Sequence, residues 1–216
     1  MLESDDDVPQ LSSTTLAALQ EFYKEKEDQE NQLKNIGAEK ESSNLTFDEN
    51  WQLSQFWYDD DTVHSFVRGI KNSTEPTGKI ALISCPTLYN EMKNQADGRQ
   101  VTLFEYDQRF AIFESDFIPY DYKSPLSIPR ELANSFDLVV ADPPFLSEEC
   151  LTKTAVTMKF LSKKKIVLST GAIMMDLAER LLGVTKCNFE PHHKNNLANE
   201  FCCFSNFNFD DAIHNK

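Results

Sequence analysis

The feature of the sequence that most restricts its fold is a series of short apolar runs separated by helical patterns. Five such runs follow Gly78, and they are Lys79–Cys85, Val101–Glu105, Asp116–Tyr122, Phe136–Ala141 and Lys165–Ser169. Strands that are buried on both faces of a sheet have this composition, and intervening helices make successive strands parallel. The chain is therefore predicted to form a doubly wound α/β domain with a Rossmann-like sheet.

The last two apolar runs, Cys187–Glu190 and Glu200–Phe204, leave no room for a helix between them. We therefore predict that they pair antiparallel, which completes a seven-stranded, mostly parallel sheet with an antiparallel final strand. Apolar residues at helical spacing predict helices over Val63–Ile70 and Ile173–Leu181. The acids Asp59–Asp61 suit the start of the first of these helices.

The N-terminal residues differ in character from the rest of the chain. Residues 1–46 are predicted to be an acidic tail, with one short amphipathic helix at Leu11–Tyr23 and a charged linker at Lys24–Glu41. The tail either solubilises the protein or helps to recruit a basic partner. A compact domain is predicted to occupy residues 47–216.

Charge and composition restrict the partners. The chain has 21 Lys and Arg against 35 Asp and Glu, a formal net charge of −14, which disfavours a phosphate backbone as ligand. No apolar run is long enough to cross a membrane, and Met1–Asp7 lacks the features of a secretory signal. The five cysteines have no framework spacing, and His192-His193 is the sole histidine cluster. We expect a cytoplasmic, monomeric protein with buried reduced thiols and no metal.

The motif richest in chemistry is Asp142-Pro143-Pro144-Phe145, which follows the fourth predicted strand. Two successive prolines make the turn rigid, so that carbonyl groups and the Asp142 carboxylate can accept hydrogen bonds from an amino group. Phe145 offers a flat face to a base or a cation. In the alternative interpretation the loop is only stiff, and Asp142 caps the helix that begins near Ser147.

This motif resembles the Asp/Asn/Ser-Pro-Pro-aromatic motif of amino-directed methyltransferases that use S-adenosylmethionine. Across roughly residues 10–205 the chain also resembles the eukaryotic elongation factor 1-alpha lysine methyltransferase 1 family. Five segments carry that resemblance: Trp51–Tyr58, Phe104–Asp107, Ala141–Cys150, Thr170–Ile173 and Asn196–Phe201. The resemblance implies transfer of a methyl group to a lysine of elongation factor 1A, with Asp142, Pro143, Pro144 and Phe145 as the catalytic loop.

The cofactor site is expected at the carboxyl ends of the strands. Glu105 lies 21 residues after Ser84, near the spacing at which an acid reaches ribose hydroxyls, and Asp107 is the second choice. Asp121 is predicted to accept from the adenine amino group. Ser84 and Pro86 stand where the superfamily usually has a glycine-rich turn, and they are assigned to the cofactor site.

The aromatic segment before the first helix is a further part of this site. Phe56, Trp57 and Tyr58 are predicted to cover the cofactor, and Asp142 is predicted to lie next to the cofactor. The alternative is that the three rings only fill the core.

Two other functions are compatible with the sequence. An adenine-N6 methyltransferase acting on DNA or RNA would use the same proline motif, but it conflicts with the net charge of −14. The run Lys163–Lys165 is interpreted as a solvated helix end rather than as part of a basic stripe. A catalytically inactive, methyltransferase-like binding module would bind S-adenosylmethionine without turnover, and the intact Asp142–Phe145 motif disfavours it.

Overall fold

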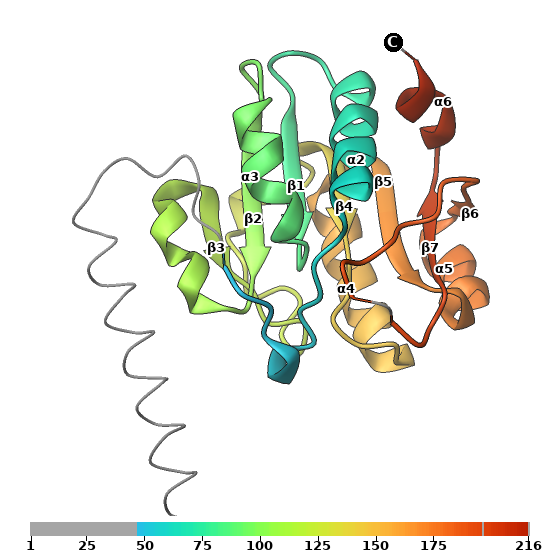
Figure 1. Cartoon of the computed structure of the whole chain (residues 1–216). Coiled ribbons are helices and arrows are strands. Elements are labelled where there is room, and N and C mark those ends of the chain that lie inside the picture. The colour runs from blue at the N-terminus through green and yellow to red at the C-terminus, as the bar shows by residue number, and fades with distance from the viewer. Residues whose placement is uncertain (1–46, 196, 216) are drawn as a thin grey trace, which may run out of the picture. The chain divides into compact units, whose positions relative to one another are not determined.

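The computed structural model of the chain describes residues 47–195 and 197–215 (Figure 1). The predicted tail, with its helix at Leu11–Tyr23 and its linker, lies outside these residues. No helix of the described part is both long enough and apolar enough to span a bilayer.

The strands of the described residues form one sheet in the order β3-β2-β1-β4-β5-β7-β6 (Figure 1). Their bounds are β1 Lys79–Ile83, β2 Gln100–Glu105, β3 Phe117–Pro119, β4 Phe136–Ala141, β5 Ser162–Gly171, β6 Thr185–Lys186 and β7 Phe201–Ser205. Strands β1 to β5 pair in parallel, whereas β7 runs antiparallel to both β5 and β6. The predicted doubly wound, seven-stranded sheet with an antiparallel end is confirmed.

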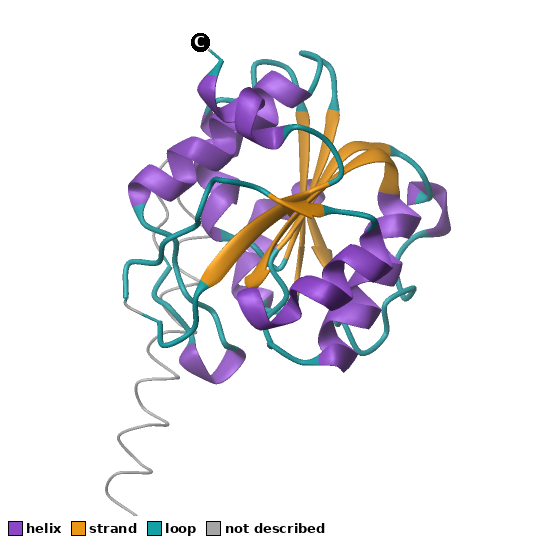
Figure 2. Cartoon of the chain, turned by 90° about the vertical axis from the view of Figure 1, so that its right-hand side faces the viewer, coloured by secondary structure: helices purple, strands orange, loops and turns teal. Residues whose placement is uncertain are grey.

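Helices cover both faces of the twisted sheet, as Figure 2 shows. Their bounds are α2 Asp60–Ser73, α3 Thr87–Asn94, α4 Glu148–Leu161, α5 Met175–Leu182 and α6 Phe209–His214. Short 3-10 turns lie at η1 Trp51–Leu53, η2 Gln108–Asp116, η3 Arg130–Leu132 and η4 Ala172–Met174. Helices α2, α3 and α6 pack in one core, and α4 and α5 pack in the other.

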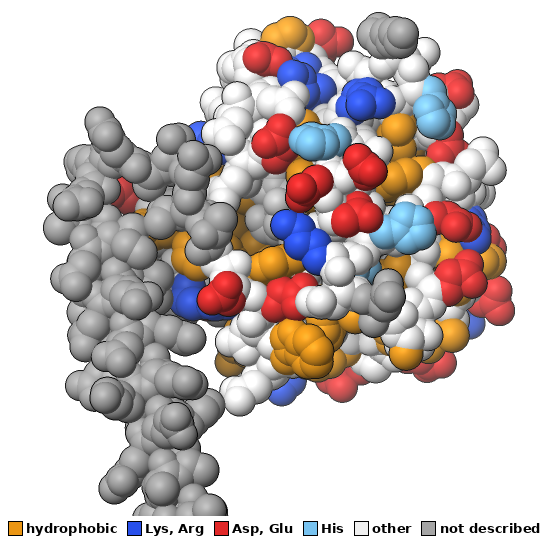
Figure 3. Space-filling model, in the orientation of Figure 1, with side chains coloured by type: hydrophobic (Ala, Val, Ile, Leu, Met, Phe, Trp, Pro, Cys, Tyr) orange, Lys and Arg blue, Asp and Glu red, His pale blue; other side chains and the backbone are white. Residues whose placement is uncertain are grey.

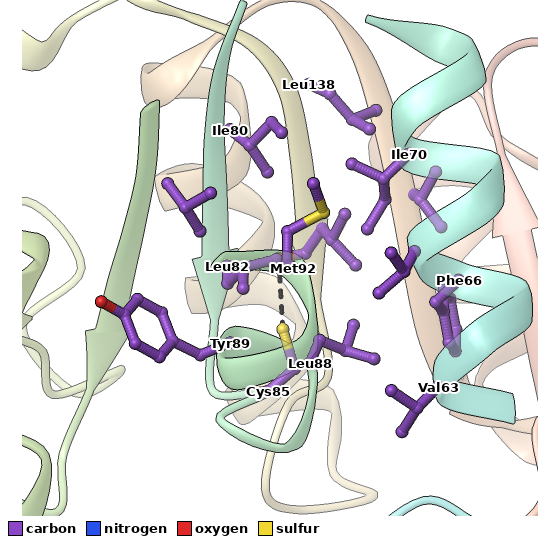
Figure 4. Close-up of a cluster of buried hydrophobic side chains, with 14 of the residues drawn as sticks. Val63, Phe66, Ile70, Ile80, Leu82, Cys85, Leu88, Tyr89, Met92 and Leu138 are labelled. Carbon is purple, nitrogen blue, oxygen red and sulfur yellow. Dashed lines mark hydrogen bonds between the residues drawn. The ribbon is translucent and has the colours of Figure 1, made fainter. Parts of the chain in front are cut away.

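Alternation along the strands divides the side chains between the two cores. In β1, Ile80 and Leu82 point to the core of α2 and α3, which Figure 4 draws, while Ala81 and Ile83 point to the core of α4 and α5. All four side chains are fully buried. Burying a residue such as Leu or Ile contributes about 1.5–3 kcal/mol, so strands with two buried faces are the main source of stability.

Helix α2 begins where the sequence predicted. The Asp59 carboxylate caps it by accepting a hydrogen bond from the Thr62 N–H at 2.8 Å, and Asp60 and Asp61 occupy the first turn. Acidic groups at this end interact favourably with the helix dipole. Consequently the aromatic segment Trp51–Tyr58 forms the loop that leads into α2, next to the carboxyl end of the sheet.

Four local predictions differ from the structure. The run Lys163–Lys165 is the start of β5 and not a helix end; Lys163 pairs with Asp137 at 2.8 Å, and the Lys165 ammonium donates to the Ser73 carbonyl at 2.7 Å. Strand β6 precedes the predicted Cys187–Glu190. It was missed because both its residues are exposed.

The predicted helix over Ile173–Leu181 begins only at Met175, because residues 172–174 form the 3-10 turn η4. Gly183 ends the helix as predicted, with a left-handed backbone at φ 64°. The strand predicted at Asp116–Tyr122 is likewise shorter, at Phe117–Pro119. All five cysteines are buried free thiols, as predicted.

Candidate active site

A cavity of about 490 Å³ opens at the carboxyl edge of the sheet, in the size range of small-molecule sites. Its walls come from the turns after β1, β2, β3 and β4, from residues 52–57 of the aromatic segment and from the stretch before β7. Crevices at the strand ends of open α/β sheets are the usual ligand sites. Most of the predicted site residues line it: Phe56, Trp57, Ser84, Pro86, Glu105, Asp121, Asp142, Pro143, Pro144 and Phe145.

The Asp142–Phe145 loop is fixed at both ends. The Asp142 N–H donates to the Ile83 carbonyl of β1 at 3.0 Å, and Ser147 caps α4 by accepting from the Cys150 N–H at 3.2 Å. Because Ser147 is the cap, the alternative in which Asp142 serves only as a helix cap is wrong. Phe145 is 43% exposed at the cavity mouth, edge-on to the ring of Tyr122 at 5.9 Å.

The Asp142 carboxylate faces the cavity with one oxygen already bound. Its Oδ2 accepts a hydrogen bond from the Tyr58 hydroxyl at 2.5 Å, and no described residue donates to Oδ1. Burial raises the pKa of Asp142 to about 7, the Tyr58 hydrogen bond opposes this rise, and the charge of Glu105 adds to it. Asp142 is therefore a hydrogen-bond acceptor that changes protonation state near neutral pH.

Tyr58 does not line the cavity, contrary to the prediction that it covers the cofactor. It is 1% exposed and lies in the core behind Asp142, where burial raises its own pKa well above the usual value. Its ring lies tilted against that of His193, with the ring centroids 4.9 Å apart, and the two residues also form an antiparallel bridge. The sequence prediction had the right segment but the wrong role, because the backbone turns this side chain inward.

His193 is a cavity residue that the sequence did not identify. Its ring contacts Tyr58 and also Phe201, at 4.7 Å, and burial lowers the pKa of His193 to about 4. The imidazole is thus neutral at physiological pH and adds an uncharged wall.

Glu105 ends β2 inside the cavity and is 4% exposed. Its Oε1 accepts from the N–H groups of Tyr106 and Asp107 at 3.0 and 3.2 Å and from the Gln55 amide at 3.4 Å. No described residue donates to Oε2, so this oxygen is available to a ligand in the cavity. Burial raises the pKa of Glu105 to about 7.

The second choice for the ribose, Asp107, does not line the cavity. It is paired with the Arg109 guanidinium at 2.7 Å, and it also accepts from the Gln55 amide at 3.2 Å. Gln55 thus bridges both acids, while its own oxygen accepts from Arg109 at 3.1 Å. Apart from its place next to Phe56, no sequence pattern predicts that this glutamine is buried.

The turn after β1 makes the sharp bend without glycine. Ser84 has φ 53°, in the left-handed region that favours glycine, and its N–H donates to the Phe104 carbonyl at 2.9 Å. The turn therefore has a left-handed backbone conformation even though it lacks the usual glycine. Asp121 follows β3 and lines the opposite part of the cavity, where its Oδ1 accepts from the Lys123 N–H at 2.8 Å.

Phe56 and Trp57 form an aromatic wall. The Trp57 indole N–H donates to the Phe47 carbonyl at 2.8 Å, and the Trp57 backbone N–H donates to Glu49 Oε1, also at 2.8 Å. Trp57 also packs partly against the core. Trp57 thus lines the cavity and also contacts the core, and its predicted role in covering the cofactor stays a prediction.

Comparison with known proteins extends these observations. A family model described as Probable N6-adenine methyltransferase matches residues 49–209. EEF1A lysine methyltransferase 1 of Mus musculus is 51% identical over 205 residues, 94% of each chain. The Gallus gallus protein of that name is 48% identical over 209 residues, 96% of this chain and 98% of the relative. A solved branched-chain polyamine synthase from Thermus thermophilus shares the fold, at 9% identity and a TM-score of 0.57, over 74% of this chain and 59% of that one.

The sheet order, together with an Asp-Pro-Pro-Phe loop beside an acid-bearing cavity, defines a methyltransferase that uses S-adenosylmethionine. The sequence identity to the two relatives is near one half over almost the whole of both chains, which narrows this class to one family. The chain belongs to the EEF1A lysine methyltransferase 1 family. The family model's description names adenine and the relatives' names name lysine. Both carry an amino group, and one Pro-Pro loop can accept hydrogen bonds from either.

The cavity fits this methyl donor by its own chemistry. It offers flat aromatic faces, a buried carboxylate with a free oxygen for vicinal hydroxyls, and a second carboxylate for a cationic centre. Neither Glu105 nor Asp142 is paired with a lysine or arginine of the described residues, so a cationic ligand would compensate charges that the chain leaves uncompensated.

Proposed function

We propose that this protein transfers a methyl group from S-adenosylmethionine to a lysine Nζ of translation elongation factor 1A, as a cytoplasmic monomer. The observation that carries the reaction is the Asp142 carboxylate, which has Oδ2 held by Tyr58 and Oδ1 directed to no partner, in a rigid loop at the cavity. The substrate is proposed from the names of relatives at 46–51% identity.

The cofactor half is assigned by position. When bound, S-adenosylmethionine supplies an electrophilic methyl group on a sulfonium centre. Glu105 Oε2 would accept from the ribose hydroxyls, Asp121 from the adenine amino group, and Phe56 and Trp57 would exclude water from one side. Ser84 and Pro86 line the cavity beside the β1 turn, so they would contact the cofactor at that end.

The acceptor lysine must lose its proton before it can react. With a reference pKa near 10.4, neutralising a lysine at pH 7 costs roughly 4–5 kcal/mol. A desolvated mouth favours the neutral amine, and Asp142 Oδ1 together with carbonyl groups of the proline loop would orient its lone pair. Phe145 would flank the lysine stem and the cationic centre. Asp142 thus contributes mainly by positioning and by accepting a hydrogen bond.

The alternative function, methylation of adenine N6 in DNA or RNA, lacks electrostatic support. The formal net charge is −14, and the lysine run of β5 is partly engaged within the domain, with Asp137 and Ser73. A nucleic-acid site needs several free cations to displace counterions from phosphates. Protein substrates need none.

A direct experiment offers labelled S-adenosylmethionine to the purified protein with elongation factor 1A, with double-stranded DNA or with RNA. We expect label only in the protein, on lysine by mass spectrometry; label only in nucleic acid would reverse the assignment. Asp142→Ala should abolish transfer while calorimetry still detects cofactor binding. Full methylation by that variant, with binding intact, would disprove the role of Asp142.

A further inference from the structure

The described residues expose six large hydrophobic side chains, and these are not scattered at random. They are Trp51, Tyr106, Leu126, Phe145, Val156 and Ile173. Isolated exposed apolar groups need no explanation, whereas a group gathered at one place indicates a contact surface. Four of the six border the cavity mouth.

Tyr106 and Phe145 line the cavity itself. Trp51 stands immediately before the lining segment 52–57, with its ring 6.0 Å from that of Phe56. Its indole donates to Glu49 at 3.0 Å, which fixes the ring although 68% of the residue is exposed.

Ile173 lies on the turn that follows β5, at the same edge of the sheet. Two residues before it, Gly171 packs so closely on the loop of Asp142 that an added Cβ would lie 2.8 Å from a methyl carbon of Leu146, a lining residue. Ile173 is 69% exposed. We refer to Trp51, Tyr106, Phe145 and Ile173 as the mouth cluster.

The width of the mouth cluster indicates what it can contact. Tyr106 follows β2 and Ile173 follows β5, and β1 and β4 lie between these strands. Three interstrand spacings amount to about 14 Å. An aliphatic lysine stem fills only the centre of such an area, so the outer members reach groups beyond the modified residue.

Charge around the mouth cluster adds a second criterion. Glu148 and Asp61 start α4 and α2 near this edge, both are exposed, and their side chains have no hydrogen bond or ion pair within the described residues. Acidic side chains also recur across the face drawn in Figure 3. Lys123 is the one lysine or arginine among the described residues that line the cavity, so acids outnumber cations here. An apolar centre with a net acidic periphery complements a basic surface with apolar groups around the lysine.

We propose that the mouth cluster is the docking surface for a folded, basic protein, and that it recognises apolar side chains flanking the target lysine rather than a linear sequence. This inference rests on the proposed function and adds to it the tertiary nature of the substrate. Trp51 and Ile173 carry the test, because neither lines the cavity and both are exposed.

The experiment measures steady-state methylation of folded elongation factor 1A by Trp51→Ala, Ile173→Ala and the double variant. We expect KM for the protein to rise about 5–30-fold in each single variant and further in the double variant, as for truncation of interface anchors. The kcat value should stay within about twofold, and the Kd for S-adenosylmethionine should not change. Leu126→Ala and Val156→Ala are matched controls, exposed apolar residues outside the cluster, and should leave KM unchanged.

A short synthetic peptide carrying the target lysine completes the design. Wild type should methylate it with a much higher KM than the folded protein, and Trp51→Ala should not alter that value. Equal KM values for peptide and protein, or a double variant indistinguishable from the controls on the folded protein, would overturn the inference alone. Absence of wild-type turnover on elongation factor 1A would overturn the proposed function and this inference with it.

Discussion

Replacing Tyr58 with phenylalanine removes one oxygen atom from behind the site and preserves the ring. That oxygen donates to Asp142 Oδ2 at 2.5 Å from a residue that is 1% exposed. A hydrogen bond to a charged group contributes about 1.5–3 kcal/mol, and 1.36 kcal/mol corresponds to one pKa unit. Since this bond lowers the pKa of Asp142, its loss should raise that pKa from about 7 by roughly one to two units.

The expected consequence is a shift in the pH dependence of turnover. The ionised carboxylate is the stronger acceptor for the amine, and a rise of one to two units reduces its ionised fraction at pH 7 from about one half to between about one tenth and one hundredth, so the variant should lose about 5–50-fold in kcat. The loss should shrink toward pH 9, where Asp142 ionises again. The assay is kcat between pH 6 and 9.5 at saturating cofactor, compared with wild type because the lysine itself also deprotonates over this range.

A matched control is available in Tyr89→Phe. The Tyr89 hydroxyl also donates to a carboxylate, Asp116 Oδ2 at 2.9 Å, but neither residue lines the cavity. That variant should keep the wild-type profile. The reasoning is refuted if Tyr58→Phe has the wild-type kcat and the same pH midpoint. An equal loss of activity at every pH, with a lower Tm, would instead assign Tyr58 a packing role only.

Three further predictions concern the cofactor site and the core. Glu105→Gln should weaken S-adenosylmethionine binding about 10–100-fold in calorimetry, since it loses a charged acceptor; unchanged Kd contradicts the ribose assignment. Burial raises the pKa of Glu105 and Asp142 to about 7, above the unfolded values near 4, so in the ligand-free protein the free energy of unfolding should fall as the pH rises from about 4 to about 7 and level off above pH 8. Urea titrations should show this fall, and Glu105→Gln/Asp142→Asn should reduce it; a wild-type-like slope in that variant contradicts it. Gly69→Ala should destabilise by about 1–3 kcal/mol in urea, because its Cβ would lie 2.6 Å from the Phe209 ring, and overpacking outweighs the roughly 1 kcal/mol helix gain; stabilisation would show that the ring moves freely.

The fold was predictable to the extent that its signals are local. Strands β1, β2 and β4 are mostly apolar, and the helix α2 has both an acidic cap and an apolar stripe, so each can be predicted from a short window of sequence. Strand β6 has two exposed residues, and α6 has six residues in all. Neither is long enough to show a period, and both depend on pairing or packing with distant segments.

The site residues also divide into those that a local sequence pattern predicts and those that depend on distant contacts. Asp142 and Glu105 were predictable because a polar residue directly after a buried strand has to lie at the carboxyl edge. The inward position of Tyr58 was not, because its partner is 84 residues away and the contact exists only after the sheet has assembled. Gln55 is similar, with an acid 50 residues away. Long-range polar contacts of buried groups leave no periodic trace in the sequence.

The electrostatics of the cavity connect its folding cost with its choice of ligand. Glu105 is buried and Asp142 is half-buried, and every hydrogen bond that they accept within the described residues comes from a neutral donor. The nearby Arg109 is paired with Asp107 instead. Two carboxyl groups with pKa values near 7 therefore remain uncompensated, which destabilises their ionised forms in the free protein. A sulfonium cofactor and a lysine both bring positive charge to this cavity, whereas an adenine in a polynucleotide brings a neutral base and anionic phosphates. The two uncompensated carboxyl groups thus favour a cationic donor and a protein amine over an anionic polynucleotide at the same Pro-Pro loop.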